Sequence, residues 1–160
     1  MTKIDAERLI QELQNIPSGQ SFLEHSLSQI LRQADKQLGE AIRLCSIPHW
    51  FNAEILGVLR QDTKDMVVNE KLFEAIVEYS FVQVDADGLA TYHEEVRKVL
   101  IHWWQQKDNL RQYKLVSQWL SNYFLATYNS QEIIRNLQAQ QRTRENLLQK
   151  DLLYAVEAIF

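Results

Sequence analysis

The histidines and the single cysteine are the side chains of this chain best suited to metal binding, acid–base chemistry or nucleophilic attack. His49 and His102 each stand beside a tryptophan, with no cysteine or carboxylate at the spacing of a metal-ligand pair. His93 is followed by two glutamates, but Arg97 stands where the zinc motif His-Glu-x-x-His requires its second histidine. We therefore expect neither a metal nor a cofactor.

Cys45 lies on the apolar face of a predicted helix, with Arg43 as its nearest basic residue. Such a thiol is more often a buried structural side chain than a nucleophile. A single cysteine also excludes an internal disulfide and is typical of a reducing cytoplasm. The nucleophile elbow Gly-x-Ser-x-Gly is absent, and none of the four glycines belongs to a phosphate-binding P-loop. The sequence therefore predicts a non-catalytic, cytoplasmic protein.

The composition is that of a folded chain. The 160 residues (18.9 kDa) are 46% hydrophobic and include only four glycines and two prolines, so a sizeable core can form. No apolar run reaches the ~18 residues of a transmembrane helix, and the N-terminal residues are too polar for a secretory signal. The formal net charge of -4 works against DNA binding by bulk charge.

A β-hairpin is predicted within a sequence that is otherwise helical. Residues 81–84 and 89–92 are short runs rich in β-branched and aromatic side chains. They flank Asp85-Ala86-Asp87-Gly88, whose final Asp-Gly pair tolerates the positive φ of a tight turn. A two-stranded ribbon is marginal in water and needs helices beneath it. Several helices, one hairpin and then a helix over 94–106 follow the order of a winged helix.

Capping residues and breakers divide the rest of the chain into helices. Ser21 with Glu24 forms a capping box ahead of an apolar stripe. The stripe fits either one long helix or two helices joined near Asp35, and we prefer two because Asp35 can cap the second. Pro48 ends that helix, and Asn52 caps a short one. Further helices are predicted over 3–14, 65–79, 110–128 and 131–160. We therefore expect a mainly α fold with an N-terminal helical segment (1–35), a winged-helix-like unit with one β-hairpin (36–104) and a C-terminal helical hairpin (105–160).

Four segments occur in a characteristic order: Ile42 to Phe51, Glu54-Ile55-Leu56, Leu72 to Val82, and Tyr92 to Arg97. This order resembles the winged-helix segment of signal-transduction ATPases of the NB-ARC or STAND type. Tyr92-His93-Glu94 stands where that family has Met-His-Asp. The resemblance covers residues 27 to 104, and LVSQWLSNYF and ENLLQKDLLYAVEAIF further on resemble the start of the α-helical repeats that often follow such a segment.

The resemblance implies a vestigial nucleotide contact at His93. In the family, the motif histidine contacts the β-phosphate of bound ADP and helps to hold the off state. That state also requires the P-loop Gly-x-x-x-x-Gly-Lys-Ser/Thr, which this chain lacks, so His93 meets a nucleotide only if another chain supplies it. Taken from the residues alone, His93 is a helix N-cap or a residue of the N-terminal turn of a helix, at the end of a strand.

Aromatic side chains are the candidates for contact with a partner. Neighbouring residues lie about 100° apart on a helix, so we expect one of Trp103 and Trp104 to face the C-terminal helices and the other a partner surface. Trp119 is expected to pack in the core. Trp50 and Phe51, which follow Pro48, and Phe160, which ends an apolar stripe, are further candidates for contact with a partner. The predicted interaction residues are Trp50, Phe51, Trp103, Trp104 and Phe160.

The leading hypothesis is a non-catalytic regulatory or protein-interaction module related to the winged-helix part of STAND-type ATPases. Its partner is another protein or a second copy of the chain in a homo-oligomer, and no membrane contact is expected. The alternative is a dimeric winged-helix transcription regulator that binds DNA. The recognition helix of such a protein, over 65–79, is net acidic here, and the wing carries Asp85 and Asp87 where cations are usual. DNA binding is therefore disfavoured.

Overall fold

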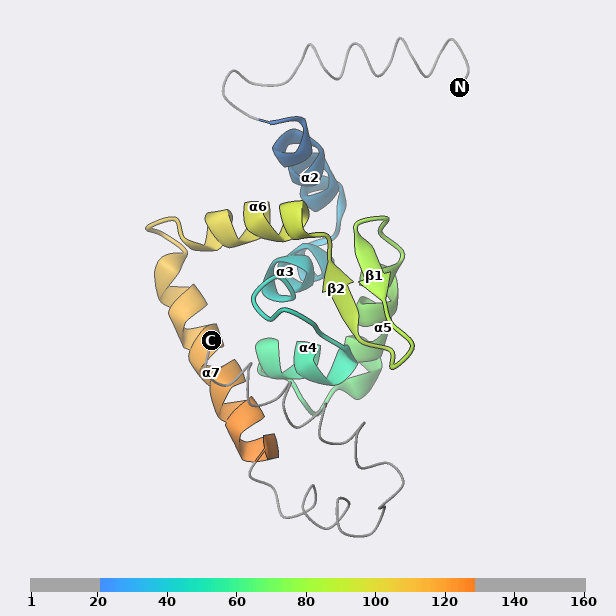
Figure 1. The fold of residues 1–160 in the computed structure, drawn as a ribbon, viewed down its shortest axis with the longest axis vertical. Helices are drawn as coiled ribbons and strands as arrows, with labels where there is room; N and C mark the ends of the chain where they lie inside the picture. Colours follow the sequence, from blue (N-terminus) through green and yellow to red (C-terminus); the bar gives the residue numbers. More distant parts are fainter. Residues whose placement is uncertain (1–20, 129–160) are drawn as a thin grey trace. The chain divides into compact units, whose positions relative to one another are not determined.

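The computed structural model describes residues 21–128, which divide between two compact units. The units are Met1–Glu40 and Ala41–Phe160, so their described parts are 21–40 and 41–128. The described chain is mainly helical with one two-stranded antiparallel hairpin, as predicted (Figure 1). The predicted helices over 3–14 and 131–160, and with them the C-terminal helical hairpin and Phe160, lie outside the described residues.

The first unit contains α2 (Phe22–Gln33) and the start of α3 (Lys36–Leu44). The predicted capping box opens α2: the Ser21 hydroxyl accepts from the amide of Glu24 at 3.2 Å, and the Glu24 carboxylate accepts from the amide of Ser21 at 2.8 Å. The predicted joint is also present, because Asp35 Oδ1 accepts from the amide of Leu38 at 2.9 Å and so caps α3. The division between the two units falls within α3, between Glu40 and Ala41.

In the second unit, α4 (Ala53–Leu59) is the central helix and packs against both α5 (Met66–Val77) and α7 (Leu110–Tyr128). Asn52 caps α4 as predicted, with its side-chain oxygen 2.9 Å from the amide of Ile55. Asp65 caps α5 in the same manner, accepting from the amide of Val68 at 3.2 Å. Ile55 to Leu59 are all buried, as expected of a short helix with packed neighbours.

The hairpin consists of β1 (Val82–Val84) and β2 (Ala90–Tyr92), which are antiparallel and pair Val82 with Tyr92. Gly88 has a φ of 79° in the connecting turn, the left-handed region that glycine adopts without steric cost. The turn also uses Asp85, whose carboxylate accepts from the amides of Asp87 and Leu89 at 2.9 Å each. α5 contacts β1 (Figure 1), so the ribbon does not stand alone in water.

A feature that the sequence did not predict is a short bridge between Phe51 and the hairpin. The amide of Phe51 donates to the Ala90 carbonyl at 2.9 Å, and the amide of Ala90 donates back at 2.8 Å. The segment before α4 therefore pairs with β2 over one residue. This pairing connects the segment before α4 to the hairpin, although Phe51 and Ala90 are 39 positions apart in the sequence (90 − 51).

After the hairpin, α6 (Glu94–Trp104) leads to α7, and the two helices contact each other (Figure 1). The buried side of α7 carries Val116, Leu120 and Phe124 at a spacing of four. Phe124 reaches Trp50 with a centroid distance of 5.5 Å. α7 therefore lies in the same compact unit as the hairpin.

Candidate functional site

His93 lies where β2 passes into α6. Its amide donates to the Phe81 carbonyl at 2.9 Å, and its own carbonyl accepts from the amide of Arg97 at 3.0 Å. These backbone bonds fix the position of the residue, while its side chain is exposed and makes no capping hydrogen bond. His93 is therefore the N-cap of α6 by backbone position alone.

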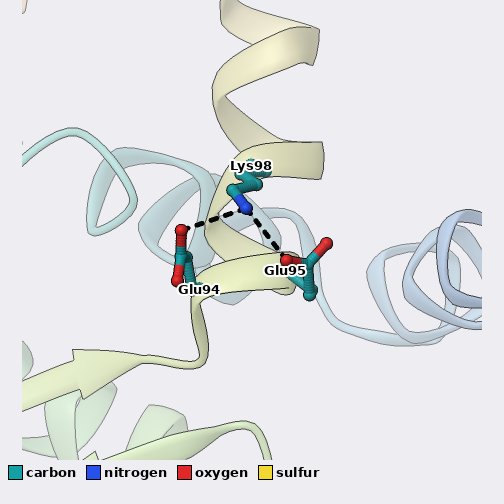
Figure 2. Close-up of polar contacts among 3 residues, drawn as sticks. All are labelled: Glu94, Glu95 and Lys98. Atoms are coloured by element: carbon teal, nitrogen blue, oxygen red, sulfur yellow. Dashed lines mark hydrogen bonds and ion pairs between the residues drawn. The ribbon is translucent and has the colours of Figure 1, made fainter.

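The surroundings of His93 are acidic. Glu94 and Glu95 form the first turn of α6, and the Lys98 ammonium lies 3.0 Å from one carboxylate and 2.9 Å from the other (Figure 2). The hydrogen bond to Glu95, followed by that to Glu94, raises the pKa of Lys98. Because all three side chains are exposed, the cluster is strongly screened by water. Carboxylates beside a helix N-terminus complement its partial positive charge, and they repel a phosphate from the same position.

The structure places Trp50 and Phe51 in the core of the second unit rather than on its surface. They are only 6% and 1% exposed. Phe51 makes edge contacts with Tyr92 and Phe73 at centroid distances of 5.1 and 6.0 Å. Both aromatic side chains thus stabilise the junction of the hairpin, α4 and α7, and neither offers its ring to a partner.

Trp103 and Trp104 differ in burial, although their rings are in edge contact at a centroid distance of 4.9 Å. Trp104 is 2% exposed, lies 6.4 Å from the Tyr113 ring on α7, and donates from Nε1 to the Arg43 carbonyl at 2.8 Å. Trp103 is 37% exposed, with the Arg43 guanidinium 4.8 Å from its ring centroid. Trp104 is therefore a core residue, and Trp103 is the member of the pair that a partner can reach.

A set of exposed apolar residues on α7 was not predicted. Trp119, which the sequence analysis assigned to the core, is 36% exposed, and Leu115 one turn earlier is 43% exposed. Leu125 and Tyr128 are exposed further along the same helix. The sequence could have identified them because this segment has more large apolar residues than one buried stripe of a helix can hold. Val116, Leu120 and Phe124 already fill that stripe, so the additional apolar residues must face elsewhere.

Cys45 is fully enclosed in the turn after α3, and burial raises the pKa of its thiol. A thiol that stays protonated is a poor nucleophile and a poor metal ligand, as expected of a structural cysteine. Among residues 21–128, no cluster of three or more histidine, cysteine, aspartate or glutamate side chains could hold a metal ion.

Comparison of the chain with protein-family models, with curated proteins and with solved structures gave no match. The resemblance to STAND-type ATPases stays a prediction from the sequence. Of the helices in the described part of the chain, none combines the length and the apolar character needed to cross a lipid bilayer.

Proposed function

We propose that the chain is a non-catalytic regulatory module that binds another protein or a second copy of itself, and that it is related to the winged-helix part of STAND-type ATPases. The observation that carries this proposal is the exposed apolar side of α7. Leu115 and Trp119 stand one turn apart, so their side chains are neighbours on the helix surface. We call these two residues the α7 apolar pair.

The position of the α7 apolar pair favours a role in binding. The buried stripe of α7 faces the interior of the unit, whereas Leu115 and Trp119 beside it remain 43% and 36% exposed. Full burial of a large apolar side chain contributes roughly 1.5–3 kcal/mol, and covering the exposed part of each of these two contributes a fraction of that. Tryptophan is also enriched among the residues that dominate binding energies. Trp103 adds a second exposed indole at the end of α6, the helix that α7 contacts.

Self-association is the first arm of the test. We expect sedimentation equilibrium to show a concentration-dependent dimer, and Leu115→Ser with Trp119→Ser to weaken it at least tenfold, which corresponds to about 1.4 kcal/mol. The matched control is Lys114→Ser with Gln118→Ser, because both residues are exposed on α7 and both are polar. Circular dichroism of each variant verifies that the helices are retained.

A different protein partner is the second arm. A photoreactive amino acid at position 119 is expected to give an adduct of one defined size with a partner in cell extract, and the same probe at position 118 should give none. An adduct that forms equally at both positions reports non-specific contact. A strictly monomeric chain that also yields no adduct specific to position 119 would refute the proposal.

The alternative function is DNA binding. The order of helices and hairpin supports it, and the charge of the exposed surface opposes it. The exposed charged residues of α5 are Glu70, Lys71 and Glu74, and its C-cap Glu78 is exposed as well. Three carboxylates against one ammonium give this surface a net charge of -2. A helix that lies against phosphates requires lysine or arginine at such positions, so we place protein binding first.

A further inference from the structure

A cavity of about 120 Å³ lies within the second unit, between the segment after α3, α6 and α7. We call it the α6–α7 cavity. Among residues 21–128, the lining is rich in groups that donate hydrogen bonds and includes no aspartate or glutamate. The lining residues are Ile47, His49, Arg97, Tyr113, Ser117, Leu120 and Ser121.

Arg97 gives the cavity its charge. Its Nε donates to the Pro48 carbonyl at 3.3 Å and its Nη2 donates to the Ile47 carbonyl at 3.0 Å, so the guanidinium plane is held in place. Arginine has five N–H donors, and these two bonds leave the others available. Arg97 is partly buried and forms no ion pair with any carboxylate of residues 21–128. A partly buried cation without a counter-ion favours an anion beside it.

Three residues that carry hydroxyls line the same cavity from one side of α7. Tyr113, Ser117 and Ser121 follow one another at a spacing of four residues, so they form a row along the helix. Within residues 21–128 none of these hydroxyls makes a hydrogen bond. Thr127 on the same helix behaves in the usual way, donating to the Tyr123 carbonyl at 2.9 Å. The row therefore offers donors that the fold itself does not use.

We propose that the α6–α7 cavity binds a phosphate-sized oxyanion, with Arg97 supplying the charge and the hydroxyls of Ser117, Ser121 and Tyr113 supplying further hydrogen bonds. A cavity of about 150 Å³ holds a benzene molecule, so about 120 Å³ suits a group of phosphate size. Pockets for drug-sized ligands span roughly 300–1,000 Å³. A nucleotide is therefore too large to enter as a whole. Convergent donors, with no carboxylate among the lining residues of 21–128, distinguish an anion site from one for a cation.

This binding site is independent of the proposed protein-binding role. The α7 apolar pair does not line the cavity, so either inference can fail while the other stands.

The test is a titration with inorganic phosphate at constant ionic strength, followed by heteronuclear NMR and by calorimetry. We expect saturable shifts of the Arg97 Nε–H and of the amides of Ser117 and Ser121, with a dissociation constant on the order of 1 mM. Chloride at the same ionic strength should shift none of them. A phosphate titration without saturable shifts at these groups would overturn the proposal.

Two variants identify the site. Ser117→Ala with Ser121→Ala keeps the helix, because alanine is the better helix former, and should weaken phosphate binding at least tenfold, since hydrogen bonds to charged groups are the stronger kind. The matched control, Gln118→Ala with Asn122→Ala, changes exposed residues of α7 outside the cavity and should bind as the wild type does. Arg97→Gln should abolish binding.

Undiminished binding by the double serine variant would also refute the site, and its folding can be verified by circular dichroism. Methyl phosphate distinguishes two sources of the anion. Binding of inorganic phosphate alone supports a free ion as the ligand, and equal binding of methyl phosphate supports the phosphate group of a larger molecule.

Discussion

Gly57 lies inside α4 at a position where a larger residue has no room. A Cβ atom there would stand 2.7 Å from Nδ2 of Asn69 and 3.3 Å from the carbonyl oxygen of Asp62. The Asn69 side chain cannot easily retreat. It is fully buried, donates to the Asp62 carbonyl at 2.7 Å, and accepts a hydrogen bond from Arg60. The close contact between α4 and α5 therefore requires glycine, which has no side chain, at position 57.

Gly57→Ala is expected to lower the free energy of unfolding by about 1–3 kcal/mol through overpacking, although alanine is favoured over glycine in helices by up to about 1 kcal/mol. Urea denaturation followed by circular dichroism measures the change. Asn69→Ala completes a double-mutant cycle, because removing the amide gives the new methyl group its space. If the losses of unfolding free energy of Gly57→Ala and Asn69→Ala simply add in the double variant, the two positions do not clash and this prediction is wrong.

His93 begins α6 without using its side chain as a cap. A serine at an N-cap accepts a hydrogen bond from the amide two or three residues on, here Val96, so His93→Ser should raise the free energy of unfolding by about 0.5–1 kcal/mol. Thermal and urea denaturation measure this gain, and His93→Ala, which offers no cap, should change the stability little. Stabilisation of the wild type by ADP that is lost in His93→Ala would instead assign the imidazole to a nucleotide.

At the scale of elements, one buried contact joins the hairpin to α3. The Tyr92 hydroxyl on β2 donates to the Ile42 carbonyl at 3.0 Å. Burial is the main reason why the pKa of Tyr92 lies well above its ordinary value of 10.0, and interaction with Cys45 adds to it. Burial likewise raises the pKa of Cys45 from its ordinary value of 9.0. Both groups stay protonated in the folded state at a pH where the unfolded chain has lost these protons.

The second unit is therefore expected to lose stability under alkaline conditions. Below pH 9 neither group releases a proton on unfolding, so their full contribution is present. Above pH 9 unfolding releases the Cys45 proton, and near pH 10 the Tyr92 proton as well, so stability falls as pH rises, at about 1.4 kcal/mol per pH unit for each group. Urea denaturation between pH 8 and pH 10 measures the slope. Cys45→Ala should remove the part that begins at pH 9, and an unchanged slope in that variant would contradict this assignment.

The element boundaries that could be predicted from the sequence are those set by local chemistry. Ser21 and Asn52 cap helices because their side chains bond to amides three residues away. Gly88 forms the turn because it alone relieves the strain of a positive φ there. Such interactions lie within a few residues of one another, so a short window of sequence contains both partners.

The missed features depend on contacts between distant segments. The burial of Trp50 and Phe51 requires α7 and the hairpin, and no local pattern distinguishes this apolar pair from an exposed one. The α6–α7 cavity depends on Arg97 reaching carbonyls about 50 positions earlier in the chain. Its row of hydroxyls on α7 was readable as a period of four, yet only the packing of α6 and α7 makes that row line a cavity.

For the molecule as a whole, the distribution of charge favours the proposed protein-binding role over DNA binding. The chain has a net charge of -4. Negative groups occupy both elements that a winged helix presents to DNA: Glu70 and Glu74 are exposed on α5, and Asp85 and Asp87 are exposed in the turn of the hairpin. Their field opposes the approach of a polyanion, and salt screens it.

The chain is therefore expected not to bind duplex DNA. Fluorescence anisotropy of a labelled random duplex at low and then moderate salt should show no affinity within the non-specific range of about 10⁻⁴–10⁻⁶ M. Glu70→Lys with Glu74→Lys is the positive control, because it reverses the charge on the same surface of α5. If the fold presents α5 in the manner of a winged helix, this variant gains weak binding that falls steeply with salt. Tight, salt-dependent binding by the wild type would reverse the order of the two hypotheses, since a cationic surface outside the described residues would then have to outweigh the acidic helix and turn.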